Sequence, residues 1–121
     1  MFNQHIAGNA GLMQSTAASY EATGAKATEE DTQGLVDRAE VLLSQAIDAG
    51  VSDSVVSAYN DKIAGLQEIL NTEYASEEER AKAIAALDLG PATQTLLEAA
   101  EAAEALNEET EKWKTEYGYL D

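Results

Sequence analysis

The sequence of 121 residues contains no cysteine, and it has one histidine, one proline and one tryptophan. Without cysteine, the chain can form no disulfide framework, no thiolate metal site and no thiol nucleophile. The length fits one domain with one appended segment and is too short for the two-lobed scaffolds of large enzymes. The single histidine, His5, has no triad partners on a defined scaffold. The acidic residues also lack the spacing of calcium loops or di-iron bundles. We therefore expect a protein that is not an enzyme and has no catalytic, cofactor-binding or metal-binding residues.

Basic residues are scarce. Seven Lys and Arg stand against 23 Asp and Glu, which gives a formal net charge of −16. Binding to phosphates requires clustered cationic side chains, and here the few basic residues lie far apart in the sequence. The composition argues against direct binding to nucleic acid and to anionic membrane surfaces.

Long apolar runs are absent as well. The first 30 residues have no basic start followed by a continuous apolar stretch, so we expect no secretory signal peptide. No window approaches the ~18 apolar residues of a membrane span. We accordingly expect no membrane insertion and a cytoplasmic or virion location.

Residues 1–33 are rich in Gly, Asn, Ser and Thr and have too few large apolar residues for a core of their own. We interpret this segment as an extended N-terminal arm that is flexible or ordered by a partner, preceding a helical domain at residues 34–121. Several apolar residues fall loosely on one helical face, so short helices could form against a receiving surface. The residues of the arm that we expect to bind a partner are Phe2, Ile6, Leu12 and Met13.

A helical hairpin is predicted next. The first helix spans about residues 30–49, with Thr28 and Asp31 as an N-terminal cap and Gly50 as the left-handed residue that ends it. Ser52 is the predicted N-cap of a second helix that runs to Leu70. The short connection makes the two helices antiparallel. Gly65, inside the second helix, indicates either a close helix approach or a soft point.

Two more helices follow. Ser76 and Glu79 form a capping-box pattern that starts a short third helix, and the Leu89–Gly90–Pro91 sequence marks its end and the start of a long fourth helix. At about 1.5 Å per residue the fourth helix is a rod of about 40 Å. We therefore predict an all-α, four-helix bundle-like domain.

The fourth helix carries an uninterrupted apolar seam with alternating steps of three and four residues. Such a seam packs either against other helices of the same chain or against another chain, and the sequence leaves both interpretations open. Because the helix is longer than the others can cover, we expect part of it to contact another chain. The seam residues are Leu96, Ala99, Ala103, Leu106, Thr110, Trp113, Tyr117 and Leu120, and all of them except Thr110 are predicted to bind a partner.

An acidic stripe lies opposite this seam and consists of Glu101, Glu104, Glu108 and Glu111. It is typical of a solvated outer face, and a surface that binds a basic partner is the alternative.

These observations favour a non-enzymatic structural or adaptor subunit of a multi-component assembly, such as a bacteriophage virion protein or a component of an exported appendage. Its partners would be protein subunits of the same assembly, and we expect it to be oligomeric. One alternative is an acidic, immunity-like inhibitor or nucleic-acid mimic that binds a basic groove. Another is an assembly chaperone or scaffold.

Overall fold

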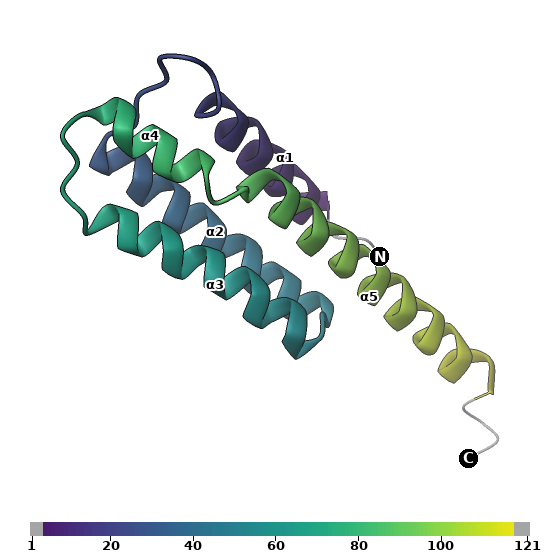
Figure 1. Cartoon of the computed structure of the whole chain (residues 1–121). Coiled ribbons are helices and arrows are strands. Elements are labelled where there is room, and N and C mark those ends of the chain that lie inside the picture. Colours follow the sequence, from purple (N-terminus) through teal and green to yellow (C-terminus); the bar gives the residue numbers. More distant parts are fainter. Residues whose placement is uncertain (1–3, 118–121) are drawn as a thin grey trace.

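The structure is a computed structural model that describes the backbone of residues 4–117 and the side chains of residues 6–106. The described part of the chain forms five helices and no strand (Figure 1). The predicted all-α, bundle-like fold is confirmed. The helices are α1 (Gln4–Ser19), α2 (Glu29–Ala49), α3 (Asp53–Leu70), α4 (Glu77–Ala85) and α5 (Leu89–Tyr117).

Helices α2 and α3 form the predicted antiparallel hairpin. Thr28 and Asp31 make a reciprocal capping box at the start of α2, with both hydrogen bonds 3.0 Å long. At the other end Gly50 has φ 101°, the left-handed conformation that glycine adopts without steric cost. Ser52 is the N-cap of α3 by backbone position, but its side chain makes no capping hydrogen bond.

The junction between α4 and α5 differs in detail from the prediction. Ser76 caps α4 by accepting a hydrogen bond from the Glu79 amide at 3.2 Å, as expected. The helix ends at Ala85, however, and the residue with positive φ is Asp88, at 54°, rather than Gly90. Helix α5 therefore begins before Gly90, and Pro91 lies in its first turn, where its missing amide hydrogen leaves no intrahelical bond unmade.

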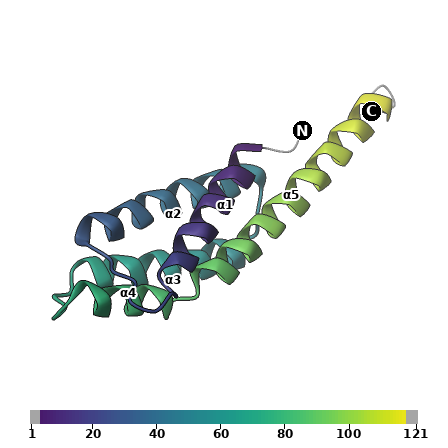
Figure 2. The same cartoon turned by 90° about the horizontal axis from the view of Figure 1, so that it is seen from above.

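The N-terminal segment differs most from the prediction. About half of it is helix α1, which packs alongside α5 and α2 instead of extending away as an arm (Figures 1 and 2). Ile6, Ala10, Met13 and Ala17, spaced by four, three and four residues, form its buried stripe. The glycines that dilute this segment lie away from that stripe, since a Cβ added at Gly8 or Gly11 would meet nothing within 4 Å. The receiving surface for this helical face is supplied by the same chain.

The close approach at Gly65 resolves one alternative left open by the sequence. A Cβ at this position would lie 2.8 Å from the Leu87 Cδ2 atom, well inside ordinary contact distance. Gly65 therefore lets the segment between α4 and α5 lie directly against α3.

Candidate functional site

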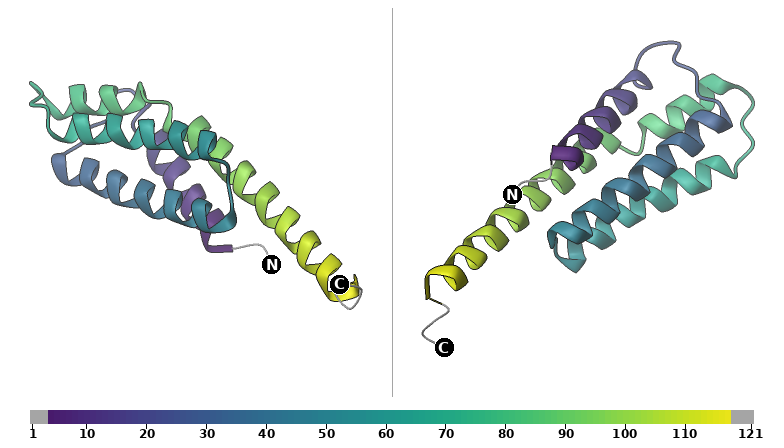
Figure 3. Two further views of the ribbon diagram at one scale, coloured as in Figure 1. Left: turned by 90° about the horizontal axis from the view of Figure 1, so that it is seen from below. Right: turned by 180° about the vertical axis from the view of Figure 1, so that it is seen from behind.

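Helix α5 divides into a packed half and a projecting half. Its first turns bury Leu89, Thr93, Leu96 and Ala100, each at most 2 % exposed. The C-terminal part of the helix continues past the ends of α1, α2 and α3, which is visible from several sides (Figures 2 and 3). We call the part of α5 from Glu101 to Tyr117 the projection.

The predicted seam coincides only partly with the buried stripe. Leu96 belongs to both, but Ala99 and Ala103 are half-buried and Leu106 is 64 % exposed. The buried stripe passes through Ala100 instead of Ala99. The seam residues Ala99, Ala103 and Leu106 thus lie to one side of the stripe that packs within the bundle.

The other predicted partner-binding residues have different surroundings. Ile6 and Met13 are at most 1 % exposed and are covered by helices of this same chain, whereas Leu12 on the outer side of α1 is 54 % exposed. Trp113 and Tyr117 lie on the projection, and their side chains are outside the described residues. Phe2 and Leu120 are also outside the described residues.

A half-open pocket of about 290 Å³ lies between α3 and the packed half of α5. We call it the α3–α5 pocket. The sequence gives no sign of this pocket, because its walls come from parts of two helices that only the fold brings together. Its lining residues are Ser54, Val55, Ala58, Tyr59, Lys62, Ala92, Thr95 and Leu96.

A buried pair of hydroxyl groups lies behind this pocket. The Tyr59 hydroxyl and Thr93 Oγ1 are 3.0 Å apart and form a hydrogen bond across the α3–α5 interface. Burial raises the pKa of Tyr59 above its ordinary value of 10.0, and the hydrogen bond with Thr93 opposes that rise. At the edge of the pocket, Lys62 Nζ donates a hydrogen bond of 2.6 Å to the Leu87 carbonyl oxygen. The lysine ammonium is therefore held in one place.

The opposite end of the bundle is acidic. The first turn of α2 carries three carboxylates and so does the first turn of α4, and the Ala27 amide donates a 2.9 Å hydrogen bond to the Glu77 carbonyl oxygen. The two helix starts are thereby joined. Negative side chains in these positions favour the positive ends of the helix dipoles. The six carboxylates are those of Glu29, Glu30, Asp31, Glu77, Glu78 and Glu79.

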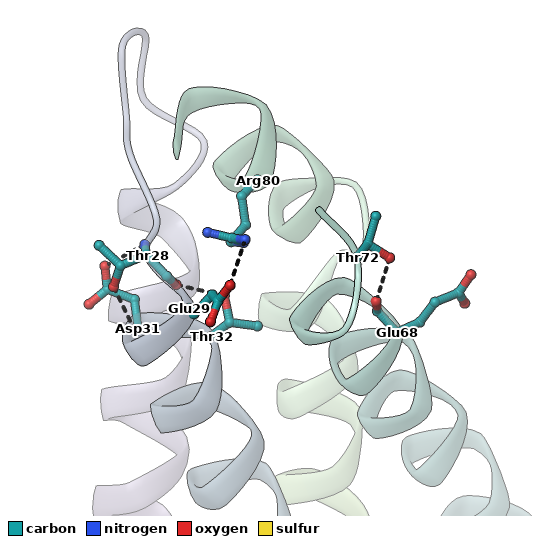
Figure 4. A network of polar contacts seen from close by, with 7 residues as sticks. All are labelled: Thr28, Glu29, Asp31, Thr32, Glu68, Thr72 and Arg80. Carbon is teal, nitrogen blue, oxygen red and sulfur yellow. Dashed lines mark hydrogen bonds and ion pairs between the residues drawn. The ribbon is translucent and has the colours of Figure 1, made fainter. Parts of the chain in front are cut away.

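Arg80 lies between these two acidic helix starts (Figure 4). Its guanidinium lies 3.8 Å from a Glu29 carboxylate oxygen and 5.4 Å from the centre of the Tyr74 ring, at distances typical of a weak ion pair and a cation–π contact. Although Arg80 is only 8 % exposed, its Nε atom makes no hydrogen bond. Figure 4 also shows the Thr28 and Asp31 cap beside it, and the Thr72 hydroxyl bound to the Glu68 carbonyl oxygen.

The acidic stripe is only partly described. Glu101 is exposed and Glu104 is half-buried, while the side chains of Glu108 and Glu111 are outside the described residues. Glu77, Glu78 and Glu79 do not extend the stripe, because α4 starts at the end of the bundle remote from the projection (Figure 1).

Neither a membrane-spanning helix nor a metal-binding cluster occurs among the described residues. None of the described helices combines the length and the apolar character that crossing a bilayer requires. Within the same part of the chain, no group of three or more His, Asp and Glu side chains is arranged to hold a metal ion. Comparison of the sequence and the fold with protein families, curated proteins and solved structures finds no significant match.

Proposed function

We propose that this chain is a non-enzymatic structural or adaptor subunit of a multi-component assembly, such as a virion or an exported appendage, and that it binds its neighbour through the projection of α5. The observation that carries the proposal is the length of α5, a helix of 29 residues whose C-terminal part extends beyond the other helices of the chain (Figure 3). A helix without tertiary cover gains little from packing in an isolated chain. A neighbouring subunit would supply that packing.

The side chains at the base of the projection fit a helix-packing surface. Ala99 and Ala103 are small, which allows a neighbouring backbone to approach, and Leu106 offers an exposed apolar side chain one helical turn further on. The pattern continues in the sequence through Trp113 and Tyr117, residue types that commonly contribute large contact area in interfaces. Burial of these residues would stabilise the assembly without any change in the bundle.

The test compares variants of the projection with a variant of the bundle surface. Leu106→Glu and Trp113→Ala should remove the chain from the complex isolated from its native source, as measured by native mass spectrometry. Val41→Glu is the matched control, because Val41 is 49 % exposed but lies on α2. If both projection variants remain in the complex at full stoichiometry, the proposed docking role is wrong.

A second candidate function is an acidic inhibitor or nucleic-acid mimic that occupies a basic groove. The six carboxylates at the joined starts of α2 and α4 favour it, since they come from two elements at one end of the molecule. Binding of this kind should weaken steeply with salt, because exposed charges are screened over about 8 Å at physiological ionic strength. The triple substitution of Glu77, Glu78 and Glu79 by Gln should abolish it, whereas docking through the projection should be unaffected.

The third alternative, an assembly chaperone or scaffold, could use the same projection. A chaperone and a permanent subunit would bind through the same surface. They differ in how long they stay bound, because a chaperone leaves before the assembly is complete. Presence of the chain in the finished complex at fixed stoichiometry therefore favours the subunit over the chaperone.

A further inference from the structure

The α3–α5 pocket differs from three other hollows of the described surface in the charge of its lining. One of these three includes Glu21 and Glu78 beside Lys82, a second includes Glu40, and a third includes Asp37 beside Arg38. No carboxylate lines the α3–α5 pocket, and its one charged lining residue is the cation Lys62. In a chain with 23 acidic and 7 basic residues, a lining with a cation and no carboxylate favours an anionic ligand.

The remainder of the pocket is apolar with a few hydroxyl groups at its edge. The ring of Tyr59 and the side chains of Val55, Ala58 and Leu96 provide hydrocarbon contact. The volume of about 290 Å³ is close to the lower end of the ~300–1,000 Å³ range of small-molecule sites, so the ligand is small. Burial of a compact hydrocarbon body against these walls would supply the non-specific part of the affinity.

Lys62 supplies the specific part of the affinity for the ligand. One of its three ammonium hydrogens is committed to the Leu87 carbonyl oxygen, and this hydrogen bond fixes the group at the edge of the pocket. Two hydrogens remain available for a ligand. A carboxylate is the matching group, because charge-assisted hydrogen bonds from ammonium to carboxylate are stronger than those to neutral oxygen.

From this arrangement we propose that the α3–α5 pocket binds a small monocarboxylate with a compact apolar body, such as a medium-chain fatty acid, with its carboxylate on Lys62 and its hydrocarbon part against Val55, Tyr59 and Leu96. The proposal is independent of the docking role of α5, since the pocket lies on the packed half of that helix.

The test measures binding of octanoate to the full chain by calorimetry, with 1-octanol and octylamine as probes of equal chain length and different charge. Octanoate should bind saturably and at least tenfold more tightly than octylamine. Lys62→Met should weaken octanoate binding at least tenfold and change 1-octanol binding less than twofold. Lys82→Met is the control, because Lys82 is exposed on α4 and does not line this pocket.

A second variant tests the location of the site. Ala58→Phe should fill the pocket and remove binding of all three probes, and circular dichroism should show an unchanged fold because Ala58 is exposed at the edge. Octanoate binding that is insensitive to Lys62→Met or to Ala58→Phe would overturn the proposal, as would absence of saturable binding below 10 mM octanoate. Light scattering that shows a dimer dissociated by Ala58→Phe would also overturn it, because a second copy would then be the occupant.

Discussion

The two halves of α5 share one apolar seam and have different environments. The packed half contains a single glutamate and the projection contains six, but the seam of three- and four-residue steps runs through both. In the packed half this spacing buries Leu96 to 2 % exposure, whereas in the projection Leu106 remains 64 % exposed. Periodicity thus determines which residues share a face, and only the length of the neighbouring helices determines whether that face is covered. The part of a seam that lacks intramolecular cover is the part available to another chain.

The largest expected difference between the two halves is in stability. Leu96→Ala should lower the free energy of unfolding by about 2–5 kcal/mol, because it removes a fully buried side chain and leaves a cavity. Leu106→Ala should lower it by less than about 0.5 kcal/mol in the isolated chain. Urea denaturation followed by circular dichroism measures both. Equal losses would mean that the projection is covered in solution, and dilution of the sample would then show whether self-association provides the cover.

The next effect tests the close contact between Gly65 and the Leu87 side chain, which lies within the bundle. Gly65→Ala should destabilise the chain by about 1–3 kcal/mol, since the new methyl group meets the Leu87 side chain. In a Leu87→Ala background the same substitution should become stabilising by up to about 1 kcal/mol, because alanine is the better helix former. Thermal unfolding of the four proteins of this cycle gives the coupling. A stabilising Gly65→Ala in the unmodified background would show that Leu87 moves aside readily.

A smaller effect distinguishes the N-terminal cap of α2 from that of α3. Thr28→Ala should cost about 1 kcal/mol, because the Thr28 hydroxyl accepts the hydrogen bond of the Asp31 amide. Ser52→Ala should cost no more than a few tenths, since the Ser52 side chain makes no capping hydrogen bond. Chemical denaturation midpoints measure the difference. A loss at Ser52 as large as that at Thr28 would indicate that Ser52 caps α3 in solution.

A further effect, of about the same size as that of Thr28→Ala, depends on pH and concerns Tyr59. Because burial raises its pKa in the folded state, the neutral phenol is the form that the fold favours. The resulting stability is fully present below the unfolded-state pKa of about 10 and is lost as pH rises through the higher folded-state value. Tyr59→Phe should cost about 1 kcal/mol at neutral pH through loss of the Thr93 hydrogen bond, and it should flatten the decline in stability above pH 10.

The sequence predicts the local parts of this fold well. Thr28, Asp31, Gly50 and Ser76 act within one or two helical turns, so their roles as caps follow from residue type and spacing alone. The hairpin of α2 and α3 follows from the short connection between two apolar periods. Gly65 shows the limit of prediction from sequence. A glycine fits there because the Leu87 side chain, more than 20 residues away in the sequence, lies against it.

The parts that the sequence does not reveal depend on packing between distant segments. In α1 a stripe made of Ile6 and Met13 with two alanines is too weakly apolar to predict a core helix, and its receiving surface comes mainly from α5 and α2. The shift of burial from Ala99 to Ala100 has the same origin, since the helices that pack against α5 select the stripe. Likewise, the α3–α5 pocket with Lys62 at its edge cannot be predicted without the relative positions of the two helices.

The contact of α1 with α5 joins the first and the last helix of the described chain. Gln14 Nε2 donates a 2.7 Å hydrogen bond to Gln94 Oε1, across 80 positions of sequence. During synthesis the ribosome releases α1 long before its main packing partner exists, so this helix completes its docking only after most of the chain has emerged. The hairpin of α2 and α3, with its local contacts, is available to fold first. We therefore expect the docking of α1 to follow the folding of the hairpin, because α1 needs a partner helix that is synthesised later.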